Sequence, residues 1–109
     1  MPYSPSYSED APERAEIDAL PGTVLVEFGT DWCGYCQGAQ PLIEAALHDF
    51  PALPCIKVED GPGRPLGRSF RVKLWPTLVF MKDGRELERL VRPASAAEIG
   101  AALARQKAA

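Results

Sequence analysis

The sequence predicts an α/β fold with a mixed β-sheet. Three short runs rich in β-branched and other apolar residues predict strands, and segments with helical spacing of apolar residues lie around them. Asp83-Gly84 is a strong hairpin signal, so the third strand is expected to have an antiparallel partner. The expected order is helix, strand, helix, strand, short helix, hairpin and helix, which is typical of the α/β class.

A single domain is expected over residues 10–109, because a chain of 109 residues matches the common domain size. Residues 1–9 are predicted to be a flexible lead-in or a poor edge strand, since they are rich in Pro, Ser and Tyr and proline cannot donate to a strand ladder. This lead-in has neither a positively charged start nor an apolar run, so it does not predict a secretory signal.

The first helix is expected to begin at Asp10, which can cap it, and to continue to about Leu20. Pro12 is tolerated in a first turn, and Glu13 has capping-box spacing. Pro21-Gly22 should end this helix just before the first strand.

Thr23–Gly29 predicts the first strand, because it is β-branched and mostly apolar, as in strands buried on both faces. Its anomaly is Glu27, since a carboxylate in such a strand lies at a surface edge or is buried for a purpose. The segment from Cys33 to Phe50 has one apolar stripe at helical spacing. Pro41 lies inside this helix and should kink it.

The second half of the chain predicts the remaining elements. Leu53–Val58 is a second strand, and a loop rich in Gly and Pro separates it from one or two helical turns at Leu66–Phe70. Leu78–Met81 is the third strand, and Arg85–Val91 is its antiparallel return. A second capping box, Ser95–Glu98, opens the last helix.

Composition argues against several classes of function. The net charge of −3 and a sequence pI of about 5.1 argue against nucleic-acid binding, which needs a basic face. No run approaches the roughly 18 consecutive apolar residues that cross a bilayer, so no membrane association is expected. Three cysteines are too few for a disulfide scaffold, and an odd number cannot all be paired within the chain. We therefore expect a soluble, cytoplasmic protein.

The motif Trp32-Cys33-Gly34-Tyr35-Cys36 carries the strongest chemical signal. Its two thiols can meet if the first caps a helix and the second lies in the first turn, and such a pair at a strand-to-helix junction indicates a redox motif. A structural disulfide and a metal site are the alternatives. Zinc typically takes four ligands, and only Cys55 and His48 remain, at spacings unlike a zinc finger. We expect no metal and no cofactor, and a solvent-facing His48.

Several motifs, in order, resemble the thioredoxin family over roughly residues 11–105. They are the strand Val24–Phe28, the motif Trp32–Cys36, the proline Pro41, the segment Trp75-Pro76-Thr77 and the turn Asp83-Gly84. The resemblance implies a thioredoxin-like fold, with a central mixed sheet of four to five strands flanked by helices. It also implies a cis peptide bond between Trp75 and Pro76, facing the cysteine pair, where the Trp75 backbone would hold a substrate segment.

The sequence departs from the family pattern around the cysteine pair. Tyr35 stands where thioredoxins usually have Pro, and Glu27 stands where they have a buried Asp. Gly29 replaces a common aromatic residue, and Cys55 falls about where a buried Lys usually faces that Asp. Arg92-Pro93 lies near the position of a Gly that opens the substrate groove in the family. Redox potential and substrate choice therefore do not follow from the resemblance.

The motif residues have expected roles in thiol–disulfide exchange. At a helix start, Cys33 would receive unpaired backbone N–H groups and the positive end of the helix dipole, which favour its thiolate. We hypothesise that Cys33 attacks a substrate disulfide and that the more buried Cys36 resolves the mixed disulfide, leaving the pair oxidised. Gly34 would keep the approach open, and Trp32 would shield Cys33. The expected substrate-binding residues are Trp32, Gly34, Tyr35, Trp75 and Pro76.

Glu27 is the candidate base that accepts the Cys36 proton, because burial raises a carboxyl pKa toward neutral pH. The alternative is an edge-strand Glu bonded to solvent or to an Arg. Cys55 is expected to be a small buried apolar residue, or a third thiol that modulates the site. Trp75 is expected beside the pair, or in the core.

The leading functional prediction is a protein-disulfide reductase that works by dithiol exchange through Cys33 and Cys36 and contributes to cell redox homeostasis. Its expected partners are disulfide-containing proteins and a recycling reductase, and the protein is expected to be a monomer. A disulfide isomerase or oxidase is an alternative, because Cys-Gly-Tyr-Cys also resembles the active site of bacterial periplasmic disulfide isomerases. A non-catalytic binding module, which captures a partner at Trp75-Pro76, is another.

Overall fold

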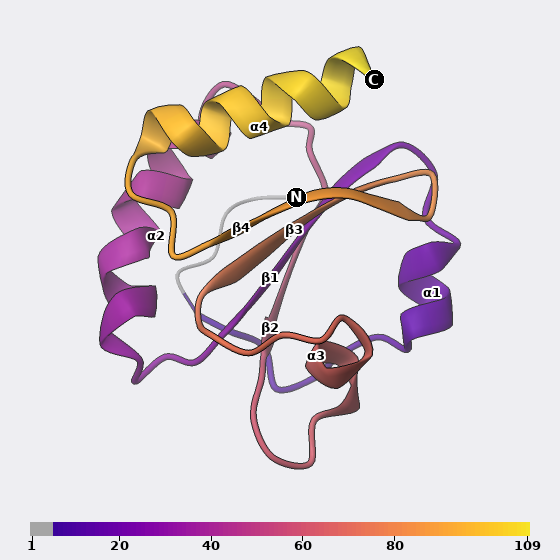
Figure 1. Ribbon diagram of the computed structural model, residues 1–109, viewed down its shortest axis with the longest axis vertical. Coiled ribbons are helices and arrows are strands. Elements are labelled where there is room, and N and C mark those ends of the chain that lie inside the picture. The colour runs from indigo at the N-terminus through magenta and orange to yellow at the C-terminus, as the bar shows by residue number, and fades with distance from the viewer. Residues whose placement is uncertain (1–5) are drawn as a thin grey trace.

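The computed structural model describes residues 6–109 and contains a four-stranded mixed sheet with helices on both faces (Figure 1). The strands are β1 (Thr23–Gly29), β2 (Cys55–Glu59), β3 (Thr77–Lys82) and β4 (Arg85–Val91). They lie in the order β2-β1-β3-β4, so β1 is internal. Because β1 is parallel to β2 and antiparallel to β3, the predicted α/β class with a mixed sheet is confirmed.

The helices of this described part are α1 (Arg14–Asp18), α2 (Gly34–Leu47), α3 (Pro65–Ser69) and α4 (Ala96–Ala108). Figure 1 shows α2 and α4 over one face of the sheet and α1 and α3 over the other. The cap predicted for the last helix is confirmed, because the Ser95 hydroxyl accepts a hydrogen bond from the Glu98 backbone N–H (3.1 Å).

The start of α1 differs from the prediction. Glu13, not Asp10, is the N-cap, and its backbone N–H donates to the Glu16 side chain (3.2 Å) in a capping box. Asp10 lies upstream of the helix, where its backbone N–H bonds to the Ser8 hydroxyl (3.1 Å). The prediction was wrong because cap preference favours Asp over Glu, whereas here the reciprocal Glu13–Glu16 bonds decide the start.

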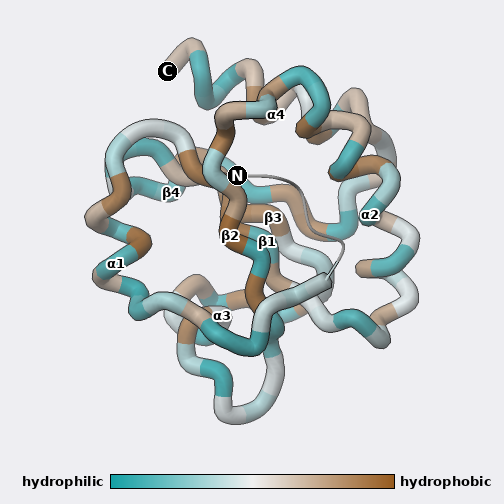
Figure 2. The backbone as a smooth tube through the Cα atoms, turned by 180° about the vertical axis from the view of Figure 1, so that it is seen from behind, coloured by the Kyte–Doolittle hydropathy of each residue, from teal (hydrophilic) through white to brown (hydrophobic). Residues whose placement is uncertain are grey.

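Apolar side chains form one core on each face of the sheet, because successive residues of a strand point to opposite faces. The core under α2 and α4 contains Leu25, Ala39, Ile43, Ala46, Leu47, Leu53, Leu78, Phe80, Ile99, Ala102 and Leu103. The core under α1 and α3 contains Ile17, Val24, Val26, Phe28, Val58, Leu66, Phe70, Val79 and Met81. Figure 2 shows hydrophobic segments along the central strands, between helices of mixed hydropathy.

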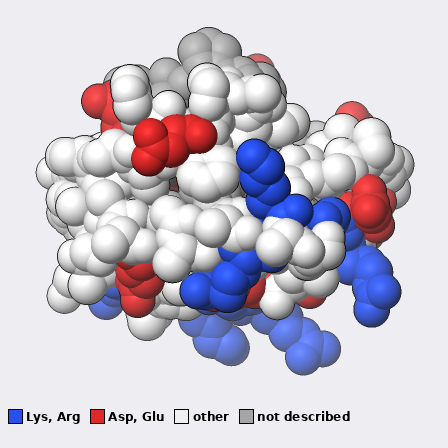
Figure 3. Space-filling model, turned by 90° about the horizontal axis from the view of Figure 1, so that it is seen from above, with Lys and Arg blue, Asp and Glu red and all other residues white. Residues whose placement is uncertain are grey.

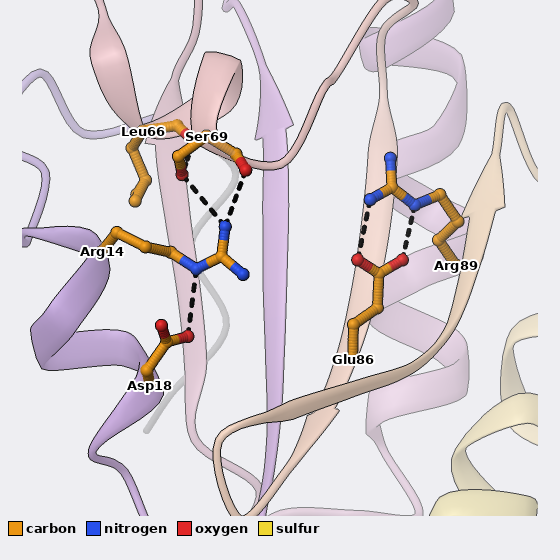
Figure 4. A network of polar contacts seen from close by, with 6 residues as sticks. All are labelled: Arg14, Asp18, Leu66, Ser69, Glu86 and Arg89. Carbon is orange, nitrogen blue, oxygen red and sulfur yellow. Dashed lines mark hydrogen bonds and ion pairs between the residues drawn. The ribbon is translucent and has the colours of Figure 1, made fainter.

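Polar contacts support these cores at the surface (Figure 4). Arg14 connects α1 to α3, because its Nη1 donates to the Ser69 backbone oxygen (2.7 Å) while its Nε pairs with Asp18 Oδ1 (3.0 Å). On β4, Arg89 forms a two-point pair with Glu86, at 2.6 and 2.8 Å. Partly exposed pairs of this kind contribute little each to stability, so the apolar cores remain the main source.

Charges of both signs lie on the face seen in Figure 3, with Lys and Arg mainly along one side of it. Among the charged groups of the protein, Arg105 Nη2 on α4 pairs with Glu88 Oε2 on β4 at 2.5 Å. Among the described residues, no helix combines the length and the apolar character that crossing a membrane requires.

The described residues before α1 pack against the edge of the sheet, so for Ser8 the flexible lead-in is wrong and the alternative of a poor edge strand holds. Ser8 forms a parallel bridge to Val58, with Ser8 N donating to Lys57 O (3.0 Å) and Glu59 N donating to Ser8 O (2.8 Å). Tyr7 is only 6% exposed. Composition could not predict the burial of Tyr7, because it depends on a space beside β1 that the tertiary structure creates. Residues 1–5 lie outside the described part.

The turn between β3 and β4 confirms the predicted hairpin. Asp83 and Gly84 both have positive φ, +50° and +81°. The Asp83 carboxylate accepts from Gly22 N (2.7 Å), which holds the turn against the α1–β1 connection. A Cβ at position 84 would collide with the backbone oxygen of Asp18. The turn therefore requires glycine for both its backbone conformation and its close approach.

Replacing Gly84 by Ala should lower the free energy of unfolding by about 2 kcal/mol, because Ala would take up left-handed φ and displace the Asp18 carbonyl. Gly100→Ala is the control, since Gly100 lies within α4 with open space around its Cβ direction and should gain up to about 1 kcal/mol. Urea unfolding measures both variants. Equal stability of the two would contradict the structural assignment of the turn.

Candidate active site

The two thiols of the motif meet at the start of α2. Cys33 is the N-cap residue, and its Sγ accepts a hydrogen bond from the Cys36 backbone N–H (3.2 Å). Both cysteines are free thiols, and they are 8% and 1% exposed respectively. The arrangement predicted from their spacing is confirmed, with the first thiol capping the helix and the second inside its first turn. Cys33 is the more accessible of the two residues.

Cys36 is held as a thiol by its surroundings. Burial raises the pKa of Cys36 to about 12, and the neighbouring Cys33 sulfur acts in the same direction. Cys36 therefore needs a base to remove its proton before it can act as a nucleophile near neutral pH.

Glu27 is buried in the centre of the sheet, so the edge-strand alternative is wrong. Its side chain is in a strand paired on both sides and is 3% exposed. The Tyr7 hydroxyl donates to Glu27 Oε2, and Gln40 Nε2 donates to the same oxygen (3.2 Å). Burial raises the pKa of Glu27, while Lys57 and the two hydrogen bonds oppose the increase. A carboxyl in this environment is suited to accept and return a proton.

Lys57, not Cys55, faces Glu27. In the parallel β1–β2 register Lys57 is the partner of Glu27, whereas Cys55 is the partner of Leu25. The expected position of Cys55 opposite Glu27 was wrong by two residues along β2, because spacing along the chain does not define the register in which two strands pair. Desolvation lowers the pKa of Lys57, and Glu27 raises it.

Cys55 itself packs half-buried against the core under α2 and α4. Its Sγ lies 3.7 Å from the Leu53 backbone oxygen, and burial raises its pKa to about 11. These features fit a small apolar residue with a weak donor. His48 is exposed at the end of α2, as expected.

Two tryptophans and a cis proline surround the pair. The peptide bond between Trp75 and Pro76 is cis, as the resemblance implied. Trp75 packs against the cluster of Tyr7, Cys33 and Cys36, so it lies beside the pair. Trp32 is 72% exposed and meets Trp75 edge-on, with 5.8 Å between ring centroids. An exposed aromatic surface next to the thiols is suited to contact a substrate segment.

A groove of about 600 Å³ runs from the motif toward the end of β4. Its lining consists of Gly34, Tyr35, Gly38, Ala39, Leu42, Arg92 and Pro93. Arg92 lies across it, with its guanidinium 3.7 Å from the Tyr35 ring centroid and its Nε donating to the Trp75 backbone oxygen (2.9 Å). Arg92 therefore occupies the backbone group that the resemblance assigns to substrate binding.

A thioredoxin family model matches residues 9–105. The chain belongs to the thioredoxin family. The solved structure of thioredoxin 2 from Pseudomonas aeruginosa PAO1 in its reduced form is 57% identical, with a TM-score of 0.85, covering 94% of this chain and 95% of that one. A thioredoxin of Chlamydia muridarum is 41% identical over 71 residues, 64% of this chain and 69% of that protein. The thioredoxin-like fold is thus established.

Membership of the thioredoxin family supports a thiol–disulfide oxidoreductase function in general. A thioredoxin of Chlamydia trachomatis serovar D is 39% identical over 71 residues, with the same shares of the two chains. Within residues 6–109, no group of three or more His, Cys, Asp or Glu side chains could hold a metal ion.

Sequence reasoning missed the side chains that complete this thioredoxin site. Tyr7 comes from before α1, Gln40 from the second turn of α2 and Lys57 from β2. One feature of the sequence pointed to Tyr7: Gly29 stands where the family commonly has an aromatic residue. A Cβ at Gly29 would lie 2.7 Å from the Tyr7 hydroxyl and 2.6 Å from Cys36 Sγ, so the glycine makes room for a ring from elsewhere.

Proposed function

We propose that this protein reduces protein disulfides by dithiol exchange and that a partner reductase regenerates its dithiol. The observation that carries the proposal is the asymmetry of the pair: Cys33 caps α2 and accepts an N–H bond, whereas Cys36 is buried as a thiol. We further propose that the protein acts in the cytoplasm and contributes there to redox homeostasis.

In the proposed reaction, the Cys33 thiolate attacks one sulfur of a substrate disulfide. A Cys33–substrate disulfide forms, and the other substrate sulfur leaves as a thiolate. Cys36 then loses its proton and attacks Cys33 Sγ, which releases the second substrate thiolate. The substrate gains two electrons, and Cys33–Cys36 becomes a disulfide that the partner reductase must reduce.

Insulin reduction tests this function directly. With dithiothreitol as reductant, the wild-type protein should accelerate precipitation of the reduced insulin chains, and Cys33→Ser should reduce the rate to that of dithiothreitol alone. Cys55→Ser is the control, because Cys55 is outside the pair and should retain wild-type activity. Binding of insulin by the wild type without turnover would instead support a binding module.

The reduction potential decides between a reductase and an oxidase. Tyr35 takes the place of the usual Pro, which frees a backbone torsion and restores an N–H at the first turn of α2. We expect a potential less reducing than the value of about −270 mV for thioredoxin. Equilibration with glutathione measures it, and Tyr35→Pro should shift it in the reducing direction. A wild-type value at or below that of thioredoxin would refute this expectation.

Arg92→Gly should increase kcat/KM for insulin about fivefold, because it removes a hydrogen bond of roughly 1 kcal/mol that competes for the Trp75 carbonyl. Arg71→Gly is a matched control, since both arginines have positive φ, +52° at Arg92 and +57° at Arg71, and Arg71 does not line the groove. An equal change in both variants would show a backbone effect, and no change in Arg92→Gly would exclude competition at the groove.

A further inference from the structure

The Tyr7 side chain fills the space beside β1 that Gly29 leaves open. The backbone N–H of Tyr7 donates to Asp31 Oδ1 (2.8 Å), and the next residue, Ser8, pairs with β2. These two backbone contacts hold the ring in place. A side chain at position 29 would overlap the Tyr7 ring, whose Cζ lies 2.7 Å from the Cβ direction of Gly29. The ring is therefore part of the site and is not a chance contact of a loose segment.

The Tyr7 hydroxyl contacts both groups between which a proton must move. It donates to Glu27 Oε2, and it packs in one cluster with Cys36, whose Sγ and the Tyr7 Oη lie 2.6 and 2.7 Å from the same Cβ position at Gly29. A phenol has one proton and can accept as well as donate. With its own proton directed to Glu27, the Tyr7 oxygen can accept from the Cys36 thiol and from Gln40 Nε2 (3.2 Å).

The groups around the hydroxyl hold it in this orientation. Gln40 Nε2 also donates to the Cys36 backbone oxygen (2.8 Å), and its Oε1 accepts from Lys57. Lys57 Nζ lies 4.6 Å from the Tyr7 ring centroid. The charged and titratable groups that face the relay are Glu27 from β1, Lys57 from β2, Cys33 and Cys36 from α2, and Asp31 from the connecting loop.

We propose that Tyr7 relays the proton of Cys36 to Glu27 while Cys36 resolves the mixed disulfide, an inference that rests on the proposed dithiol exchange. The Cys36 proton moves to the Tyr7 oxygen as the Tyr7 proton moves to Glu27 Oε2. The Cys36 sulfur forms its bond to Cys33 Sγ, and the electron pair of the Cys33–substrate bond leaves with the substrate thiolate. Tyr7 is neutral before and after the step, and Glu27 ends protonated.

A neutral relay agrees with the environment of the phenol. Burial and the neighbouring Glu27 carboxylate raise the pKa of Tyr7 far above its usual value, so a free tyrosinate does not form. The two proton movements are therefore coupled, and the relay works only while the hydroxyl contacts both partners.

Resolution can be measured separately from the first attack with a small chromogenic disulfide, 5,5′-dithiobis(2-nitrobenzoate). Its reaction with Cys33 depends on reagent concentration and releases one chromogenic thiolate, whereas attack by Cys36 releases the second in a concentration-independent step. The measurement is made by stopped flow across pH in a Cys55→Ala background. In the wild type, the resolution rate should rise as Glu27 ionises and then reach a plateau.

Tyr7→Phe keeps the ring and removes the hydroxyl. Its plateau should be about hundredfold lower, the low end of the usual contribution of acid–base catalysis, with a rate that keeps rising toward the alkaline titration of Cys36. The first attack by Cys33 should change much less. Tyr7→Leu, which also loses the ring, should lower the plateau at least as much and should unfold at lower urea concentration than Tyr7→Phe.

Three outcomes would overturn the relay. An unchanged plateau in Tyr7→Phe with a loss only in Tyr7→Leu would assign Tyr7 to packing. A profile displaced along the pH axis with an unchanged plateau height would assign it to tuning of the Glu27 pKa. Equal slowing of both phases would indicate a general disturbance of the pair. Insulin reduction by the wild type is scored separately, so a failure of the proposed function is distinguishable from a failure of the relay.

Discussion

Cys36→Ser should convert the protein from a turnover catalyst into a covalent trap for its substrates. Cys33 would still attack a substrate disulfide, but no second thiol of the protein could displace the product, since Cys36 is the sulfur next to Cys33. Turnover of insulin should fall to the rate of dithiothreitol alone, and a mixed disulfide should accumulate when the reduced variant is mixed with insulin without dithiothreitol. Non-reducing electrophoresis and mass spectrometry measure the adduct.

The controls for this experiment use the other two cysteines. Cys33→Ser should form no adduct, because Cys36 is buried and its pKa is raised to about 12. Cys55→Ser combined with Cys36→Ser should trap as much substrate as Cys36→Ser alone. Adducts located at Cys55, or turnover that persists without Cys36, would contradict the assigned roles.

Glu27→Gln should slow the resolution step by about hundredfold, because it removes the base while keeping a side chain of similar shape. Burial raises the pKa of Glu27, so the wild-type resolution rate should fall as pH is lowered through that raised value and the carboxyl becomes protonated. The variant should lose this dependence. Stopped-flow measurement of the concentration-independent phase from acidic to alkaline pH provides both the rate and its profile.

A matched control for Glu27→Gln is Glu86→Gln, which changes a carboxyl on β4 that is paired with Arg89. It should leave the resolution rate within about twofold of the wild type, since partly exposed pairs contribute little. An unchanged rate and pH profile in Glu27→Gln would remove Glu27 from the mechanism, and with it the acceptor for the Tyr7 relay.

The elements that could be predicted are those whose signal is local. Thr23–Gly29 is β-branched and apolar along its whole length, and it forms β1 with the predicted bounds. Asp83-Gly84 adopts the turn that its residue types favour, and Ser95 caps α4 as its spacing to Glu98 predicts. The start of α1 could not be predicted, since Glu13 is a weaker cap than Asp10 by residue type.

The site was predictable only in part, because some of its contacts are local in the chain and others depend on how strands pair. Cys33 and Cys36 lie three residues apart in one helix turn, so their meeting follows from local geometry. The apolar strand around Glu27 left burial and an edge position open, and the pairing of β1 on both sides decided for burial. Its partner Lys57 depended on the β1–β2 register, and a displacement of two residues along a strand keeps the same face, so hydrophobic pattern did not distinguish Lys57 from Cys55.

The sequence by itself determined the α/β class, the dithiol motif and a carboxylate in the apolar strand before it, because each depends on residues that are close in the chain. Only the tertiary structure decided how that carboxylate reaches Cys36. Tyr7 and Gln40 come from segments far apart in sequence, and they meet at Glu27 because docking of the N-terminal segment on β2 places a ring in the space left by Gly29. Contacts of this kind depend on where whole elements pack, which no local pattern of residues encodes.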